Sequence, residues 1–241
     1  MRIHIIACEV FSRELTALCA ECENTITLSL LPQGLHDTPD ILRKKLQAQI
    51  DLCAGVSVKH QPDAIALCYG QCSNGVCGLN AGEVPLVVPR YDDCIGIFLG
   101  SEERYLAHFN QSGGTYWLTP GWIEHAFLPT KENREKRYRE YLERYGKENA
   151  DYLNEEQWRW TGEYKACRYI KSPLLKERGW DKTAETIASL YGWEYAELSG
   201  SAYLLQNLVS GRWEKGDFLV CPPGYRIAPS FDERKLIAVP I

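Results

Sequence analysis

Apolar runs that alternate with segments of helical spacing organise the first hundred residues of the chain. Four short runs rich in Ile, Leu and Val predict strands: Arg2–Ala7, Thr25–Leu31, Ala64–Leu67 and Leu86–Pro89. Between them, apolar residues three and four apart predict one helix capped by Ser12, another from Thr38 to about Ala54, and a third from Cys94 to Phe109. This alternation predicts an α/β fold with a doubly wound, mostly parallel, Rossmann-like sheet.

The middle of the chain has a different pattern. A strand is predicted at Thr115–Leu118 and a turn at Thr119–Trp122, followed by Ile123, Glu124 and His125. From Lys131 to Tyr169 the chain is rich in Glu, Lys, Arg, Tyr and Trp, with tyrosines at helical spacing. We expect this segment to form a helical insertion.

The C-terminal part returns to an α/β pattern. It predicts two helices and three strands: helices Asp181–Leu190 and Ala202–Val209, and strands Trp193–Leu198, Phe218–Cys221 and Lys235–Val239. We therefore expect a Rossmann-like domain over residues 1–128, a helical connection over residues 129–190, and an α/β part over residues 191–241. That last part either extends the first sheet or forms a small second lobe.

Composition and charge narrow the class of function. The 241 residues carry a net charge of −5, and no Lys/Arg cluster interleaves with aromatic residues, which argues against a nucleic-acid surface. No apolar stretch approaches membrane-spanning length and the N-terminus lacks a signal-peptide pattern, so we expect a cytoplasmic protein that does not insert in a membrane. In that reducing compartment the ten cysteines are expected to be packing residues, metal ligands or catalytic thiols.

A cysteine-rich and glycine-rich loop follows the third predicted strand. Open α/β sheets bind ligands at the carboxyl ends of their strands, and Cys72 lies in this loop at that position. Cys8 ends the first predicted strand and Cys94 follows the fourth. If these strands are parallel neighbours, the three thiols converge on one point. We therefore predict a three-thiolate metal site, with participation of Cys68 and Cys77 left open.

Other chemistry has less support in the sequence. The thiols could be no more than small buried side chains at strand ends. Five further cysteines lie on predicted helices or strands and are expected to be spectators: Cys19, Cys22, Cys53, Cys167 and Cys221. The spacing of Gly70 and Gly75 does not complete a phosphate-binding loop, and Gly200-Ser201 does not complete a nucleophile elbow.

Six ordered motifs resemble those of a known family. They are Ile6–Val10, Pro32–His36, Tyr69–Gly75, Val88–Ile95, Phe98–Ser101 and Pro120–Glu124. They resemble the family of domain of unknown function 1638, whose members occur largely in anaerobic bacteria and methanogenic archaea and are often encoded beside corrinoid-dependent methyltransferases. The resemblance matches Cys8, Cys72 and Cys94 to the cysteine-bearing motifs of the family. Glu9 and Gln71 depart from the usual pattern, in which Gly and Leu are expected.

The residues and the resemblance together suggest a metal-dependent enzyme of one-carbon or methyl metabolism, such as a transferase or lyase. Cys8, Cys72 and Cys94 would hold a [4Fe-4S] cluster with one open iron, or alternatively a zinc ion (Zn²⁺) with one open position. The alternative hypothesis is a non-enzymatic accessory protein that binds a corrinoid cofactor or a corrinoid protein. In that case the aromatic segment from Tyr138 to Tyr169 would be the docking face, and it could also serve as a homodimer surface.

Charged residues near the predicted thiol site are candidates for catalysis. Arg90, Glu124 and His125 are predicted to act there, with Arg90 binding a small anionic substrate and one of the other two acting as acid or base. Gly70 and Gly75 are predicted to contact the cofactor. The competing interpretation is that Arg90 pairs with a neighbouring Asp, Glu124 caps a helix and His125 faces solvent.

Overall fold

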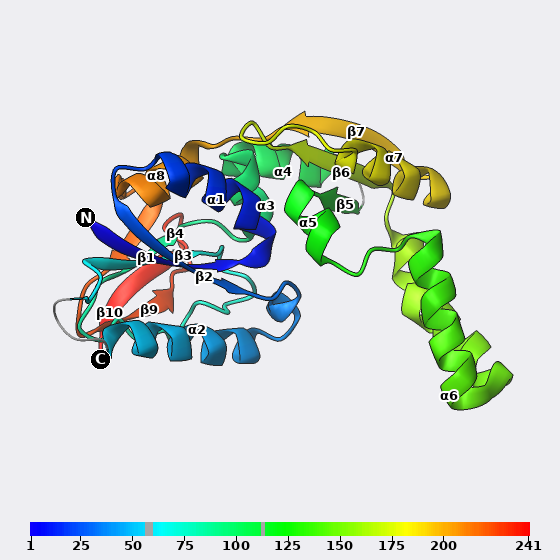
Figure 1. The fold of residues 1–241 in the computed structure, drawn as a ribbon, viewed down its shortest axis with the longest axis horizontal. Helices are drawn as coiled ribbons and strands as arrows, with labels where there is room; N and C mark the ends of the chain where they lie inside the picture. Colours follow the sequence, from blue (N-terminus) through cyan, green and yellow to red (C-terminus); the bar gives the residue numbers. More distant parts are fainter. Residues whose placement is uncertain (56–59, 112–113) are drawn as a thin grey trace.

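The computed structural model describes residues 1–55, 60–111 and 114–241, and its centre is a mostly parallel sheet flanked by helices (Figure 1). In the described chain this sheet has five strands in the order β2-β1-β3-β4-β8. Its strands are β1 (Arg2–Cys8), β2 (Thr25–Leu31), β3 (Ala64–Cys68), β4 (Leu86–Pro89) and β8 (Phe218–Cys221). The first four are parallel, and β8 pairs antiparallel with β4. The arrangement is the Rossmann-like, doubly wound fold that the sequence predicts.

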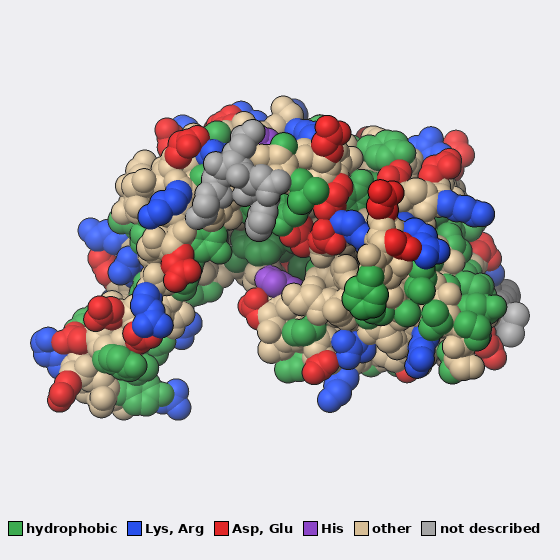
Figure 2. Space-filling view, turned by 180° about the vertical axis from the view of Figure 1, so that it is seen from behind, with side chains coloured by type: hydrophobic (Ala, Val, Ile, Leu, Met, Phe, Trp, Pro, Cys, Tyr) green, Lys and Arg blue, Asp and Glu red, His purple; other side chains and the backbone are tan. Residues whose placement is uncertain are grey.

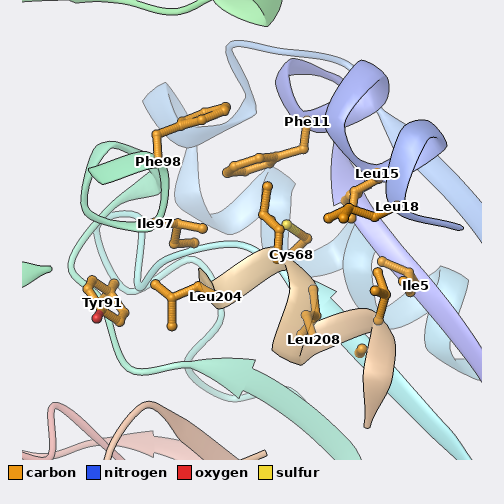
Figure 3. Close-up of a cluster of buried hydrophobic side chains, with 14 of the residues drawn as sticks. Ile5, Phe11, Leu15, Leu18, Cys68, Tyr91, Ile97, Phe98, Leu204 and Leu208 are labelled. Carbon is orange, nitrogen blue, oxygen red and sulfur yellow. The ribbon is translucent and has the colours of Figure 1, made fainter. Parts of the chain in front are cut away.

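Helices cover both faces of this sheet because successive strand residues point to opposite faces. One face packs against α1 (Ser12–Glu21), α3 (Cys94–Leu99) and α8 (Tyr203–Ser210). The other packs against α2 (Pro39–Ala54) and a ribbon of β9 (Tyr225–Pro229) and β10 (Leu236–Pro240). Figure 3 shows the first of these cores, in which Phe11 stacks on Phe98 with ring centroids 4.4 Å apart.

A second sheet of three parallel strands lies beside the first. It has the order β5-β6-β7 and consists of β5 (Thr115–Leu118), β6 (Ala166–Lys171) and β7 (Glu194–Ser199). The helices α5 (Pro120–His125) and α7 (Trp180–Tyr191) pack on it around a separate buried cluster that includes Tyr169 and Trp180. The two sheets do not follow the predicted division of the chain at residues 128 and 190. Strand β5 lies before residue 129 but pairs with β6, and strand β8 of the C-terminal part belongs to the first sheet.

The segment α6 (Lys131–Trp158) is a helical hairpin that stands away from both sheets (Figures 1 and 2). The helix is interrupted at Gly146, whose φ of 75° and ψ of 171° reverse the chain. The two arms are joined by hydrogen bonds from the Tyr138 hydroxyl to Asp151 at 2.6 Å and from the Tyr141 hydroxyl to Gln157 at 2.5 Å. A short 3-10 helix, η3 (Arg159–Glu163), leads from the hairpin into β6.

Several predicted elements differ from those observed. The helix predicted over Cys94–Phe109 is two helices, α3 and α4 (Glu102–Gln111), because Gly100 adopts a left-handed conformation with φ of 68°. The predicted helical insertion ends before Tyr169, since Ala166–Lys171 forms strand β6. The short strand β9 was not predicted at all. Among the described residues, no helix is both long and apolar enough to cross a membrane.

The start of α1 also differs from the prediction. A 3-10 turn, η1 (Glu9–Phe11), runs directly into α1, so Ser12 is the first helical residue and its side chain does not cap the helix. Thr38 does precede α2 and Pro39 does occupy its first position, but the Thr38 side chain makes no capping hydrogen bond. The turn η1 matters because it links the end of β1 to α5 of the second sheet.

Candidate functional site

A cavity of about 310 Å³ opens at the carboxyl ends of the parallel strands of the first sheet. It is lined by residues at the ends of the four parallel strands β1, β2, β3 and β4 and by residues of η2 (Leu35–Asp37), α3 and α5. The lining residues are Cys8, Pro32, Leu35, His36, Tyr69, Cys72, Ser73, Asp92, Asp93, Cys94, Ile95 and Trp122. All three cysteines predicted to converge, Cys8, Cys72 and Cys94, are in this set. The volume is suited to a small molecule or a cofactor.

Strand register explains why the cysteines meet. Ala7 of β1 pairs with Cys68 of β3, so the next residues in each strand, Cys8 and Tyr69, stand at the same edge. The β3 chain then continues beside the end of β4. The backbone amide of Gln71 donates to the Tyr91 carbonyl at 2.7 Å, and that of Cys72 donates to the Asp92 carbonyl at 2.8 Å. These two bonds extend the strand pairing into the loops and bring Cys72 toward Cys94.

Gly70 permits this close approach of the two loops. A Cβ atom on Gly70 would lie 2.6 Å from the Cα of Asp93, closer than real Cβ contacts allow. Gly75 is less constrained, since its Cβ would lie 2.6 Å from the end of the Leu42 side chain and 3.0 Å from the Cys72 carbonyl oxygen. Neither glycine lines the cavity, so what the structure shows for both is a role in backbone packing.

The cysteine loop contains a left-handed turn. Cys72, Ser73 and Asn74 have φ values of 47°, 55° and 66°, a conformation that costs about 1–2 kcal/mol per non-glycine residue. The turn is closed by the Gly75 amide, which donates to the Cys72 carbonyl at 2.9 Å, and by the Gln71 side chain, which donates to Asn74 Oδ1 at 2.6 Å. Such strain tends to be kept at functional sites. Here it fixes the direction in which Cys72 and Ser73 face the cavity.

The three cavity thiols are all partly exposed and all free of disulfide bonds. Burial raises the pKa of Cys8 to about 11 and that of Cys72 to about 12. Burial raises the pKa of Cys94 well above its usual range, and the nearby Cys72 thiol raises this pKa further. The thiols are therefore protonated in the metal-free protein near neutral pH, and a bound metal would have to displace their protons.

The cavity residues do not form a complete set of metal ligands in the arrangement observed. Among the described residues, no group of three or more His, Cys, Asp or Glu side chains stands in a ready arrangement for a metal ion. Cys68 and Cys77 do not line the cavity: Cys68 points into the core (Figure 3), and Cys77 donates to Asn74 Oδ1. The predicted spectators do not line it either; Cys22, for example, donates to the Val209 carbonyl.

Two aspartates of the cavity wall are already engaged. Asp93 is the N-cap of α3, where Oδ1 accepts from the amides of Ile95 at 2.9 Å and Gly96 at 3.2 Å, and Oδ2 accepts from Tyr105 at 2.9 Å. Asp92 Oδ2 pairs with Lys235 Nζ at 2.5 Å. Because these contacts occupy the carboxylates, the cysteines are the lining residues best able to turn toward a common centre.

Three cavity residues had no predicted role: His36, Tyr69 and Trp122. His36 lies on η2 (Leu35–Asp37), with its ring 5.7 Å from that of Trp122 and its Nε2 3.2 Å from Asp37 Oδ1. Trp122 belongs to α5, which is capped by Thr119. All three residues fall in motifs that carry the family resemblance, which was a usable signal, but their convergence depends on contacts between distant segments.

Arg90 does not line the cavity. Its guanidinium donates to the carbonyls of Phe218, Arg234 and Leu236, which tie the end of β4 to β8 and to the start of β10. The predicted alternative, a pair with Asp92 or Asp93, is not the arrangement observed either. Because its donors are directed at backbone oxygens, Arg90 links strands of the fold. Its charge does not face a substrate in the cavity.

Glu124 and His125 join the two sheets outside the cavity. Glu124 pairs with Arg13 at 2.6 Å and accepts from the Trp180 indole at 3.1 Å. His125 lies 3.7 Å from Glu9 through Nδ1 and 3.3 Å from the Ser12 hydroxyl through Nε2. These contacts hold α5 against η1 and α1. They thereby position Trp122 over the cavity, and neither Glu124 nor His125 lies in its wall.

Comparisons with known proteins identify one family. The family model described as "Protein of unknown function (DUF1638)" matches residues 30–209, which include Cys72 and Cys94 but not Cys8. Neither the curated proteins nor the solved structures contain a match to the chain.

Proposed function

The chain belongs to the DUF1638 family, and from the cavity at the carboxyl edge of its first sheet we propose that it is a metal-dependent enzyme acting on a small molecule. The observation that carries this proposal is the meeting of Cys8, Cys72 and Cys94 at one cavity. Cys8 ends β1, Cys72 follows β3 and Cys94 follows β4, so the fold itself is what brings them together.

The donor set fits a thiophilic metal centre. Three thiolates suit a zinc ion or a [4Fe-4S] cluster, and three protein ligands leave one position open for substrate. When bound, either group would supply Lewis acidity at that open position. Because no ready ligand arrangement exists among the described residues, the proposal requires the three side chains to rotate toward a common centre on metal binding.

Other residues of the chain would shape the reaction space. Trp122, Leu35 and Ile95 supply apolar wall that excludes water, while the fixed Asp93 holds the start of α3 and with it Cys94. His36 is the imidazole among the lining side chains, and its ring nitrogens can donate or accept a hydrogen bond to a substrate. The gene neighbourhood implied by the family resemblance supports, within this proposal, a reaction of one-carbon or methyl metabolism.

Metal loading tests this function directly. Metal-free, reduced protein is titrated with Co²⁺, a spectroscopic substitute for Zn²⁺, or incubated anaerobically with iron and sulfide, and the thiolate-to-metal absorption is recorded. We expect about one centre per chain, and its loss in Cys72→Ala and in Cys94→Ala. Cys19→Ala is the matched control, because Cys19 is also partly exposed and lies on helix α1 outside the cavity. Full metal content in both cavity variants would refute the site.

A second candidate is an accessory protein that binds a corrinoid protein. The observation in its favour is the α6 hairpin, which projects from the rest of the chain (Figure 2). Its residues Leu142, Tyr145 and Tyr152 are exposed. Substituting these three residues with Ser would abolish binding to a corrinoid protein under this hypothesis and leave metal loading unchanged under the first. The two functions are therefore separable in one set of variants.

A further inference from the structure

The α6 hairpin has little hydrophobic core of its own. Its first arm is residues 131–145, its second arm is residues 147–158, and only Ala150 and Trp158 of the 28 residues of α6 are buried. Trp158 is at the end of α6, where its ring lies 6.0 Å from that of Phe127. Helices of this length are marginal in water unless an apolar face packs against another surface. Since Ala150 is the single buried residue near the turn, the free end of the hairpin has no such surface within the described part of its own chain.

Apolar side chains are exposed at this free end. Leu142 is 41% exposed, Tyr145 45% and Tyr152 63%. Figure 2 shows hydrophobic side chains at the end of the projecting hairpin. Leu142 and Tyr145 are three residues apart in the sequence and so share one face of the first arm. Grouped apolar side chains on a projecting element mark an interaction surface.

A shallow hollow of about 350 Å³ lies on the same face of the first arm, nearer to its base. It is lined by Lys131, Arg134, Glu135, Tyr138, Asn154 and Leu190. Tyr138 is four residues before Leu142 and seven before Tyr145, so the lining of the hollow continues into the exposed apolar surface along one face of the helix. If two hairpins lie end for end, Leu142 and Tyr145 of one copy therefore meet the hollow of the other.

The two arms carry opposite net charge. The first arm has six Lys or Arg and four Glu side chains, a net charge of +2, whereas the second has one Lys and four Asp or Glu side chains, a net charge of −3. Among the described residues no ion pair joins the arms, and Arg139, Arg144, Glu148 and Glu155 are exposed without an ion pair. A second hairpin brings the same charges, so a positive first arm faces a negative second arm twice in one symmetric contact. The hairpin is therefore complementary to a copy of itself.

We propose that α6 is a dimerisation element, and that two copies of the chain pack their hairpins end for end into a four-helix bundle with the first arm of each beside the second arm of the other. At 1.5 Å per residue each arm is about 20 Å long, so a hairpin face about 20 Å wide covers about 400 Å² per copy. Contacts of this size are weak, and the dimer is expected to form reversibly at micromolar concentrations. The inference does not rest on the metal chemistry proposed above.

Paired charge reversals test this contact. Arg139→Glu with Arg144→Glu makes both arms acidic, and Glu148→Lys with Glu155→Lys makes both arms basic. We expect sedimentation equilibrium between about 1 and 100 µM to show a reversible dimer for the wild type and about tenfold weaker association for each reversed variant. An equal mixture of the two variants should dimerise again, because each acidic arm then meets a basic one. Contact between two copies of the chain predicts this rescue, whereas contact with another protein does not.

Lys44→Glu with Lys45→Glu is the matched control. Both lysines are exposed on α2, and this double reversal changes the net charge by the same amount as the first variant does. It should associate as the wild type does. Circular dichroism should give the same helix content for all of these proteins, which separates lost association from lost structure. Leu142→Ser with Tyr145→Ser provides a second test, since it keeps every charge and should also weaken association.

Wild-type protein that stays monomeric at about 100 µM would overturn the inference, and binding of a corrinoid protein by that monomer would assign the hairpin to the accessory function. Dimers that persist unchanged in both reversed variants would place the contact elsewhere on the chain. A mixture of the folded variants that stays monomeric would contradict the pairing of unlike arms. Undiminished association in Leu142→Ser with Tyr145→Ser would contradict the apolar contact.

Discussion

Gly70 and Asp93 lie in backbone contact, with space between their chains for a hydrogen atom but not for a methyl group. This contact joins the loop that carries Cys72 to the loop that carries Cys94. The Gln71 and Cys72 amides form their hydrogen bonds to the second loop immediately beyond it. The spacing of the two thiols thus depends on the absence of a side chain at one position outside the cavity.

Gly70→Ala is therefore expected to damage the site and the fold together. The added Cβ would have to displace the Asp93 backbone, at a cost of about 3 kcal/mol in the free energy of unfolding. We expect Co²⁺ binding to weaken in parallel, as measured by urea unfolding and by cobalt absorption. Gly216→Ala is the control, since no atom lies within 4 Å of its Cβ position. Equal stability of the two variants would show that the loops are not held by this contact.

The convergence of Cys8, Cys72 and Cys94 could be predicted because it follows from local information. Each thiol comes at or just after the end of an apolar run, and parallel strands share their carboxyl edge. The strands β2, β4, β5 and β8 were predicted with the bounds observed, since their β-branched or apolar runs end at turn residues. The metal itself stays a prediction.

Other features could not be predicted because distant segments determine them. Arg90 occupies a strand end, as expected, but its partners are carbonyls 128 to 146 residues further along the chain. The strand β6 was not predicted because its aromatic and charged residues resemble those of the helical segment before it. Its Arg168 can be buried because it pairs with Glu194 of the neighbouring strand at 2.9 Å. Tyr69 and Trp122 meet at one cavity only because the two sheets pack together.

Lys235 is expected to be a major electrostatic contact of the cavity wall. Its ammonium contacts Asp92 at 2.5 Å and Glu102 at 2.7 Å, and its side chain is only 20% exposed. Lys235→Met would leave two adjacent carboxylates without this cation, lowering the free energy of unfolding by about 2 kcal/mol at pH 7. Burial raises the pKa of Glu102 and Lys235 opposes this, so the deficit should shrink in acid as Glu102 protonates. Urea unfolding at pH 7 and pH 4 measures it, with exposed Lys215→Met as control; a deficit independent of pH would contradict the electrostatic account.

Gly146 is expected to control the α6 hairpin through conformation alone. Its φ of 75° and ψ of 171° lie in a region that other residues essentially do not enter, although no atom crowds its Cβ position. Gly146→Ala should destabilise the hairpin locally by about 1–3 kcal/mol. Hydrogen exchange of residues 138–157 should accelerate, whereas exchange in the two sheets should stay unchanged. Global destabilisation would instead mean that the hairpin is part of the cooperative core.

Glu14 of α1 should make stability fall as pH rises. Its side chain is 1% exposed, and burial raises its pKa from 4.5 to about 7, against the opposing effects of a backbone amide and Ser172. The folded protein thus holds this proton more tightly than the unfolded chain does. The stabilisation is fully present below pH 4.5 and is lost as pH rises through 7.

The magnitude of this effect follows from the size of the shift. Between pH 5 and pH 8 the Glu14 contribution should fall by about 2–3 kcal/mol, since each pKa unit corresponds to about 1.4 kcal/mol. Glu14→Gln mimics the neutral acid, so it should match wild-type stability near pH 5 and exceed it at pH 8, as measured by urea unfolding. Glu135→Gln, on the exposed surface of α6, is the control. Parallel pH profiles for wild type and Glu14→Gln would mean that Glu14 is ionised in the folded protein and stabilised by contacts stronger than its burial.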